Sequence, residues 1–325
     1  MNVNANPNPT RRRGTSPEKR RPTARPAPRT PLQIERLQGC LVSLVTLGLV
    51  LSALALLSYV LLRMPSPTNI LILGIDRRPG QGDATRTDTI LLLHADPGPP
   101  RMVLLSIPRD LWVTIPGHGE ERVNTAHFYG ELADPGSGPV LAAETVRQNF
   151  GVPVHRTLRL DFDAFRGVID AAGGVDIDVP APVIDDAYPT EDYGTMRIEI
   201  PAGMRHMDGE TALRYARSRH GSSDFDRAAR QQQILVALAK KLTSPGNWLL
   251  APRVYNALQD AVETDLSFRD LVRLGLTWRR AGAENVEQIV IDQALTTPYR
   301  TANGAAVLLP RWDLIIPLVE AQLIH

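Results

Sequence analysis

Arginine and aspartate residues gather in five short segments of this sequence. The segments are residues 74–78, 86–89, 106–110, 217–219 and 224–231. The planar guanidinium of arginine matches phosphate oxygens bidentately and keeps its charge at every physiological pH. Aspartate oxygens suit a hard cation such as Mg²⁺, which binds in proteins through one or two carboxylates together with substrate phosphates. The combination predicts a site for a polyanion, most simply a pyrophosphate.

The alternative to a binding site is that these arginines and aspartates form ion pairs with one another on the surface, which is the expected outcome for any single residue. Their recurrence in separated segments favours a shared site. The sequence holds no HExxH, EF-hand, GxSxG or Walker A pattern, so the corresponding metal, nucleophile and nucleotide sites are not indicated. The single cysteine, Cys40, excludes a disulfide scaffold and a cysteine-based zinc site.

Predicted strands and helices must position these segments. Short apolar runs predict strands at residues 69–73, 89–93, 102–107, 111–115, 156–160 and 175–179. Helices are predicted at residues 139–150, 163–172, 208–215 and 226–242, the first with Ser137 as a cap and Gly151 as a stop. Residues 181–200, rich in Pro, Asp and Tyr, predict a loop over one face. This order predicts an α/β fold with a mixed central sheet flanked by helices, and ligand sites at the strand ends.

A charge-free apolar run, residues 41–62, precedes the predicted sheet. At about 1.5 Å per residue it spans about 33 Å, which matches the hydrocarbon core of a bilayer. A cleaved signal peptide is the rival interpretation, but the run exceeds the roughly 7–15 apolar residues of such peptides. Residues 1–38 hold nine Lys/Arg against two Glu, a local charge of +7 that the total of +1 conceals. This asymmetry predicts a single-pass anchor with a cytoplasmic N-terminus and an extracytoplasmic main domain.

Seven blocks of the sequence resemble the LytR-CpsA-Psr (LCP) family. In order they read NILILGIDRR, TRTDTILLL, SIPRDLWVTIPG, RVNTAHFYG, LDFDAFRGVIDAAGGVDIDV, LRYARSRHG and DFDRAARQQQILVAL, and they fall within residues 68–242. The resemblance implies an α-β-α domain of a membrane-anchored enzyme on the outer side of the cytoplasmic membrane. Such enzymes transfer glycopolymers, such as teichoic acids or capsular and other wall polysaccharides, from a polyprenyl-pyrophosphate carrier to peptidoglycan through a phosphodiester bond.

The same resemblance implies roles for individual residues. Asp76 and Asp88 match the family's magnesium-associated aspartates, with Mn²⁺ as the other possible ion, and together with Arg109 they are the expected catalytic residues. The implied pyrophosphate-binding side chains are Arg78, Arg109, Arg217, Arg219, Asp224, Arg227 and Gln231, with Arg86 as a weaker candidate. The sequence departs from the family's usual residues at Ile75, His127 and Glu131. We expect His127 to have a packing or surface role, with a proton shuttle as the alternative.

The chain is expected to have four regions. These are a disordered basic cytoplasmic tail (1–38), a transmembrane signal anchor (39–63), an extracytoplasmic LCP catalytic domain (68–245) and a C-terminal extension (246–325) that packs on or completes it. The extension holds a predicted helical segment at 271–278 and a strand at 286–291. A basic tail beside a membrane span fits anionic lipid better than nucleic acid, so no nucleic-acid partner is expected.

The expected function is Mg²⁺-dependent phosphotransfer in cell-wall assembly. Its expected partners are a polyprenyl-pyrophosphate-linked glycan, peptidoglycan and membrane lipid. The carrier's tail requires an apolar tunnel, for which the inner strand faces and the stripe Ile234, Leu235 and Leu238 are candidates, although such residues more often form ordinary core. Three alternatives stay open: a lipid-pyrophosphate hydrolase with water as the acceptor, a membrane-bound transcriptional regulator or attenuator, and a non-catalytic wall-binding module.

Overall fold

The computed structural model describes residues 31–62, 67–77, 82, 84–190, 194–218, 223–261 and 263–324. The chain divides into two compact units, Met1–Leu57 and Ser58–His325. Two predicted site residues, Arg78 and Arg219, lie outside the described residues.

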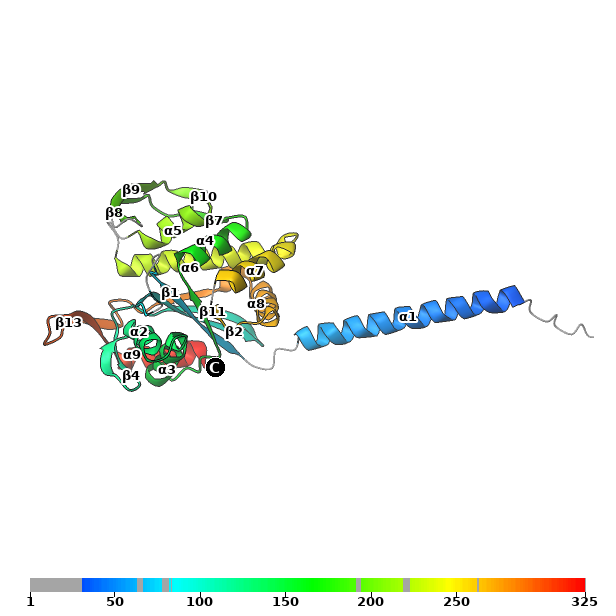
Figure 1. Ribbon diagram of the computed structural model, residues 1–325, viewed down its shortest axis with the longest axis horizontal. Helices are drawn as coiled ribbons and strands as arrows, with labels where there is room; N and C mark the ends of the chain where they lie inside the picture. Colours follow the sequence, from blue (N-terminus) through cyan, green and yellow to red (C-terminus); the bar gives the residue numbers. More distant parts are fainter. Residues whose placement is uncertain are drawn as a thin grey trace, which may run out of the picture. The chain divides into compact units, whose positions relative to one another are not determined.

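Helix α1 (Pro31–Leu62) contains the charge-free apolar run (Figure 1). Its segment Val42–Tyr59 is long and apolar enough to cross a membrane, and none of that segment is buried by protein. An apolar surface of this extent suits a bilayer better than water. The described part of the helix extends ahead of the predicted anchor, so residues 31–38 of the predicted basic tail are helical, and residues 1–30 of that tail lie outside the described residues.

A six-stranded mixed sheet lies at the centre of the second unit, as predicted. Its order is β11-β6-β1-β2-β3-β12. The strands are β1 (Thr68–Ile75), β2 (Thr87–Pro97), β3 (Pro100–Ser106), β6 (Arg156–Leu160), β11 (Glu263–Thr264) and β12 (Glu287–Val290). Strands β1, β2 and β3 form an antiparallel meander, while β6 runs parallel to β1 and β12 runs parallel to β3.

Alternating strand residues divide the core between the two faces of this sheet. Leu71 and Leu73 pack toward α2 (Thr125–Ala133), α3 (Gly138–Phe150) and α9 (Trp312–Leu323). Ile70 of β1 and Leu93 of β2 instead pack toward α6 (Asp224–Thr243) and α8 (Phe268–Ala281). Successive side chains of a strand point to opposite faces, so two apolar faces require two helical layers. The result is the expected α-β-α arrangement (Figure 1).

Two strand pairs and two helices adjoin the α6 side of the sheet. The helices are α4 (Phe162–Ala171) and α5 (Gly209–Arg217). One antiparallel pair joins β7 (Val175–Val179) to β10 (Gly203–Met207), and the hairpin of β8 (Val183–Pro189) with β9 (Thr195–Ile200) lies between them in the chain. The predicted loop over residues 181–200 is therefore wrong, because β8 and β9 form an antiparallel pair within it. Its Pro and Asp content suggested a loop, but Tyr188, Ile198 and Ile200 are buried and anchor the pair.

Residues 246–325 supply both edge strands of the central sheet, β11 and β12. The same region adds η1 (Asn247–Leu250), α7 (Ala251–Ala261), α8, η2 (Ala283–Asn285), the hairpin of β13 (Thr296–Arg300) with β14 (Ala306–Pro310), and α9. The predicted helix and strand of this region are confirmed as α8 and β12.

The predicted stop signal of α3 is confirmed, whereas its predicted N-terminal cap is not. Gly151 ends α3 with a φ of 70°, a left-handed conformation that glycine adopts without strain, as predicted. Ser137 does not cap α3 through its side chain, because its hydroxyl donates to the Gly130 carbonyl oxygen at 2.6 Å. Strand β4 (Trp112–Ile115) forms a further hairpin with β5 (Gly119–Arg122).

Candidate functional site

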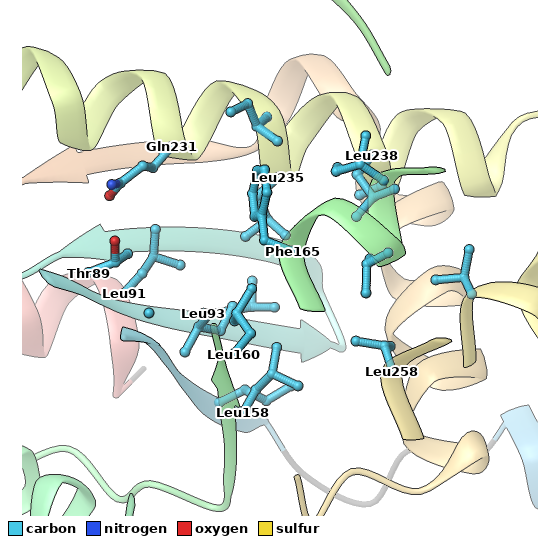
Figure 2. A pocket seen from close by; sticks show the side chains of 18 of the residues that line it. Thr89, Leu91, Leu93, Leu158, Leu160, Phe165, Gln231, Leu235, Leu238 and Leu258 are labelled. Atoms are coloured by element: carbon cyan, nitrogen blue, oxygen red, sulfur yellow. The ribbon is translucent and has the colours of Figure 1, made fainter. Parts of the chain in front are cut away.

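An apolar cavity of about 880 Å³ lies between the sheet and helices α4, α6, α7 and α8 (Figure 2). Its floor includes three cross-strand pairs of β1 and β2: Ile70 with Leu93, Ile72 with Leu91, and Gly74 with Thr89. A Cβ atom on Gly74 would lie 2.9 Å from the Cβ atom of Thr89, so a larger side chain would force this part of the floor to shift.

Helix α6 gives the cavity a polar end and an apolar end. Its lining residues recur about once per helical turn, singly or as adjacent pairs: Arg227, Gln231, Ile234, Leu235, Leu238, Ala239, Leu242 and Thr243. This spacing places them on one side of the helix. The first two are polar and the next five are aliphatic, and Figure 2 shows Gln231 and Thr89 at one end with Leu258 at the other. The cavity therefore matches an amphiphile, with a polar group near the start of α6 and a hydrocarbon chain beyond it.

Arg109 lies at the polar end and is surrounded by carboxylates. Its Nη1 atom donates to Asp88 Oδ1 at 2.7 Å, its Nε atom lies 3.4 Å from Asp110 Oδ2, and its Nη2 atom lies 3.8 Å from Asp224 Oδ2. Burial alone would lower the pKa of Arg109, but the hydrogen bond to Asp88 and the three acidic neighbours outweigh it and raise the pKa. The guanidinium therefore keeps its charge at every physiological pH.

Arg217 approaches the same end from α5. Its Nη2 atom lies 3.7 Å from Asp76 Oδ2, and its Cζ atom lies 3.9 Å from the centre of the Phe162 ring. Its Nη1 atom donates to the Tyr188 hydroxyl oxygen at 3.4 Å. Burial raises the pKa of Tyr188, and the nearby charge of Arg217 opposes that shift. The aromatic face orients the guanidinium while leaving its edge open to other acceptors.

Arg227 and Gln231 complete the polar end. The Arg227 side chain is 7% exposed, and its Nη1 atom lies 2.9 Å from Asp224 Oδ1. The Nε2 atom of Gln231 is 3.5 Å from the Ala216 carbonyl oxygen.

The predicted residues Asp76, Asp88, Arg109, Arg217, Arg227 and Gln231 all line the cavity. Arg86 is exposed and is not among the lining residues, and Asp224 borders the site through its ion pairs.

The carboxylates at the polar end could hold a cation only if a bound ligand supplied further oxygen atoms. Within the described residues, no group of three His, Cys, Asp or Glu side chains could hold a metal ion. Asp76 and Asp88 nevertheless both line the polar end. Two carboxylates suit Mg²⁺, which completes its octahedron with phosphate oxygens and water.

Three residues at the polar end were not predicted from the sequence. Asp161 lines the cavity and accepts from Arg77 Nη2 at 2.6 Å and Nε at 3.1 Å, while Phe162 and Tyr188 contact Arg217. Asp161 and Phe162 directly follow β6, so their position at a strand end was an available signal. Tyr188 lies in the hairpin that was predicted as a loop, and no local pattern indicated it.

Comparison with known proteins agrees with this architecture. The LytR_cpsA_psr family model matches residues 58–311. The polyisoprenyl-teichoic acid–peptidoglycan teichoic acid transferase TagU of Oceanobacillus iheyensis is 35% identical over 219 residues, which are 67% of this chain and 64% of TagU. TagV of Bacillus subtilis, which carries the same activity name, is 33% identical over 205 residues, 62% of this chain and 50% of TagV. The chain thus spans less than two thirds of these two relatives.

Solved structures show the same fold. The crystal structure of B. subtilis TagV superposes with a TM-score of 0.66 at 26% identity, covering 81% of this chain and 99% of that chain. A structure of TagT bound to LI-WTA gives a TM-score of 0.64 at 26% identity, covering 80% of this chain and 92% of that chain. Because the family model spans most of the sequence and the α-β-α fold agrees, this chain belongs to the LytR-CpsA-Psr family.

Proposed function

We propose that this protein transfers a glycopolymer from a polyprenyl-pyrophosphate carrier to peptidoglycan, forming a phosphodiester bond. The observation that carries the proposal is the continuity of an arginine- and aspartate-rich end with a large apolar cavity. A diphosphate head with a long hydrocarbon tail has the matching polarity. The names of TagU and TagV, teichoic acid transferases to peptidoglycan, and the TagT complex with LI-WTA support the same substrate class.

The proposed chemistry depends on positioning and charge neutralisation. Arg109, Arg217 and Arg227 would bind the diphosphate oxygens, and Asp76 and Asp88 would hold Mg²⁺ or Mn²⁺. When bound, the ion would supply positive charge to the diphosphate. An acceptor hydroxyl attacks the phosphorus nearer the glycan, the bond from that phosphorus to the bridging oxygen breaks, and polyprenyl phosphate leaves with the bond's electron pair. The hydroxyl proton passes to Asp76, to Asp88 or to solvent, since a loose transition state needs no strong base.

The proposed location follows from the charge asymmetry around α1. Positive charge before the span would keep the N-terminus cytoplasmic and place the second unit outside the membrane, where peptidoglycan lies. A reporter fused after His325 should be active only if it is of the kind that works outside the cytoplasm. Activity of a cytoplasm-only reporter in that position would contradict the orientation.

The transferase proposal is tested with the purified full chain in detergent. The assay supplies a glycan-labelled polyprenyl-pyrophosphate donor, peptidoglycan and Mg²⁺. Label bound covalently to peptidoglycan, together with released polyprenyl phosphate, is the expected product. Free labelled glycan phosphate formed at the same rate with and without peptidoglycan would indicate the hydrolase instead. No turnover of the donor under any condition would leave the regulatory or wall-binding alternatives.

A further inference from the structure

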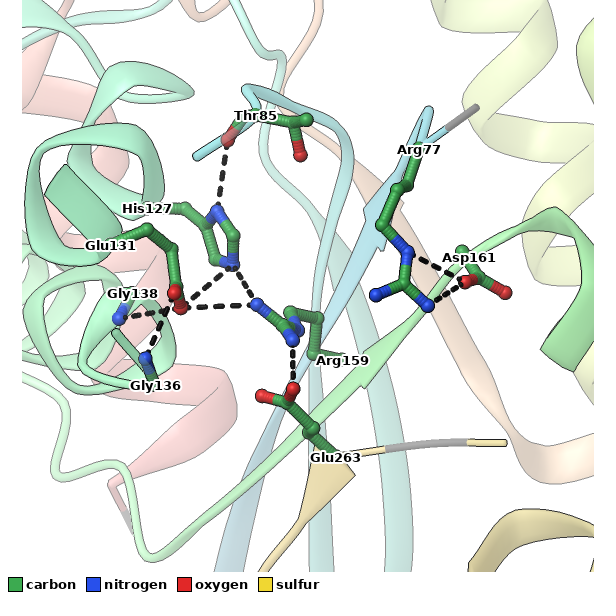
Figure 3. A network of polar contacts seen from close by, with 9 residues as sticks. All are labelled: Arg77, Thr85, His127, Glu131, Gly136, Gly138, Arg159, Asp161 and Glu263. Atoms are coloured by element: carbon green, nitrogen blue, oxygen red, sulfur yellow. Dashed lines mark hydrogen bonds and ion pairs between the residues drawn. The ribbon is translucent and has the colours of Figure 1, made fainter. Parts of the chain in front are cut away.

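A buried polar cluster lies on the side of the sheet opposite the cavity. Its members are His127 and Glu131 of α2 and Arg159 of β6, whose side chains are 0%, 1% and 4% exposed (Figure 3). Leu158 and Leu160 of β6 line the cavity, so the side chain of Arg159 between them points to the other face. None of the three cluster residues is among those lining the cavity.

Glu131 and Arg159 form the rigid part of the cluster. Glu131 Oε1 accepts from Gly138 N at 3.0 Å and from Arg159 Nη1 at 3.0 Å, and Oε2 accepts from Gly136 N at 2.9 Å. Arg159 also pairs with Glu263 of β11. A buried ion pair is maintained only when its remaining hydrogen-bonding positions are satisfied, as they are for this carboxylate. A Cβ atom on Gly138 would lie 2.6 Å from Glu131 Oε1 and 2.7 Å from His127 Cδ2, so glycine is required there.

His127 connects this pair to the segment that carries Asp88. Its Nδ1 atom lies 2.9 Å from the Thr85 carbonyl oxygen, and its Nε2 atom lies 3.3 Å from Arg159 Nη1. A carbonyl can only accept and a guanidinium can only donate. The Nδ1 atom therefore carries a proton and donates to Thr85, while Nε2 faces both members of the ion pair, 3.3 Å from Arg159 Nη1 and 3.7 Å from Glu131 Oε1. Figure 3 shows the ring between the Thr85 carbonyl and the guanidinium.

The Thr85 carbonyl group lies two residues before the start of β2. Asp88 follows three residues later and accepts from Arg109 Nη1 at 2.7 Å. A second contact, from Thr87 N to the Asn124 carbonyl oxygen at 3.3 Å, fixes the same segment from the start of α2. Helix α2 thus contacts residues 85–87 at two points, through His127 and through the residue before the helix.

We propose that His127 is a positioning residue for the site. Its Nδ1–H group, oriented by the Arg159–Glu131 pair, holds the Thr85 carbonyl and thereby sets the place of the Asp88 carboxylate. The inference rests on the proposed function, because it assigns His127 to the binding of the same diphosphate and cation. It also replaces the expectation of a packing or surface role.

Three substitutions separate positioning from simple packing. The side-chain amide of His127→Asn can occupy the place of Nδ1 and donate to Thr85, whereas that of His127→Gln reaches the place of Nε2. His127→Phe fills the space without a hydrogen bond. The probe is geranylgeranyl pyrophosphate with Mg²⁺, titrated calorimetrically into the full chain. His127→Phe and His127→Gln should weaken binding by about 10-fold or more, the usual effect of losing an outer partner of a ligand. His127→Asn should restore most of the affinity.

A matched control is His94, a second buried histidine, which lies in β2. It is 1% exposed, and its Nδ1 atom lies 2.7 Å from Asn69 Oδ1. His94→Phe should lower the melting temperature without changing the affinity. If His127→Phe binds as tightly as the wild type, or if His127→Asn is no better than His127→Phe, the positioning role is wrong.

Amide hydrogen exchange gives a second readout that needs no ligand. Residues 85–88 should exchange faster in His127→Phe than in the wild type and in His127→Asn, because the segment loses one of its two contacts with α2 and the residue before it. Unchanged exchange there would also overturn the inference. If exchange changes as expected while the wild type fails to bind the prenyl pyrophosphate, the proposed function fails and the positioning of the segment stands.

Discussion

The Nη1 atom of Arg109 lies 2.7 Å from Oδ1 of Asp88, so the site's central arginine is paired with a proposed cation ligand. Asp110 and Asp224 also lie within 4 Å of this guanidinium. A phosphate oxygen must compete with these carboxylates for the same N–H groups. A cation that binds Asp88 would release Nη1 to a phosphate oxygen. Cation and diphosphate should therefore assist each other's binding, and the effect must be reciprocal.

This coupling predicts that Mg²⁺ strengthens binding of a prenyl pyrophosphate by about 5- to 150-fold, the usual range of a coupling free energy. Asp88→Asn and Asp76→Asn remove ligand charge at nearly constant volume, so both should abolish Mg²⁺-dependent transfer while the fold stays intact. Calorimetric titration with Mg²⁺ or with a chelator measures the coupling. Asp178→Asn, an exposed carboxylate of β7, is the control. Wild-type activity and metal response in both site variants would place the cation elsewhere.

The arginines should be sensitive to shape as well as charge. Lysine offers a point charge in place of a planar fork, so Arg109→Lys and Arg217→Lys should each slow transfer by about 10²- to 10³-fold, by analogy with loss of one preorganised donor. A surface ion pair worth about 0–1 kcal/mol would give only a few-fold change. Arg280→Lys, at the exposed end of α8, should be nearly silent. Equal transfer rates in all three variants, at unchanged melting temperature, would contradict the assignment of the diphosphate site.

The apolar part of the cavity should make the affinity for a prenyl-pyrophosphate donor depend on the length of its prenyl chain. Leu235→Trp places a larger side chain in the lining and should exclude part of a long prenyl chain. Losing burial of about two methylene groups costs about 1.6 kcal/mol, or about 15-fold in affinity. Donors of several prenyl lengths, compared by KM, measure this effect, and a short donor should be affected least. Leu249→Trp, on the exposed surface of η1, is the control. A uniform effect on all donors would argue against a tail-binding cavity.

Low pH should reduce the stability of the first turn of α6, which carries Asp224 and Arg227. Asp226 accepts from the backbone N–H and the hydroxyl of Ser223, and these hydrogen bonds lower its pKa below the ordinary value of 3.8. A carboxylate with a lowered folded pKa stabilises the fold above its unfolded value, and this contribution is lost as the pH falls below 3.8 through the folded pKa. Melting temperatures from pH 7 to pH 3 should fall less steeply for Asp226→Asn than for the wild type. Identical slopes would show that this cap contributes nothing.

Much of the secondary structure of the second unit was predictable because it depends on sequence patterns within a single strand or helix. The short apolar runs of β1, β2 and β3 and the spacing of Ile234, Leu235 and Leu238 in α6 reflect the burial of a single element. The α/β class and the mixed sheet followed from the order of these elements. The prediction of a loop over residues 181–200 failed because strands β8 and β9 stabilise each other across a turn, and composition alone does not reveal such a partner.

For the site, the sequence by itself determined the residue types and their places at strand and helix ends: Asp76, Asp88, Arg109, Arg217 and Arg227. Only the tertiary structure decided which of them meet. Arg217 lies beside Phe162 and Tyr188, and His127 contacts Arg159, across long separations in sequence. Such contacts depend on how strands β1 and β6 pair and how α2 and α5 pack around them. Local periodicity encodes burial within one element, whereas the juxtaposition of two elements is fixed by the packing of the whole core.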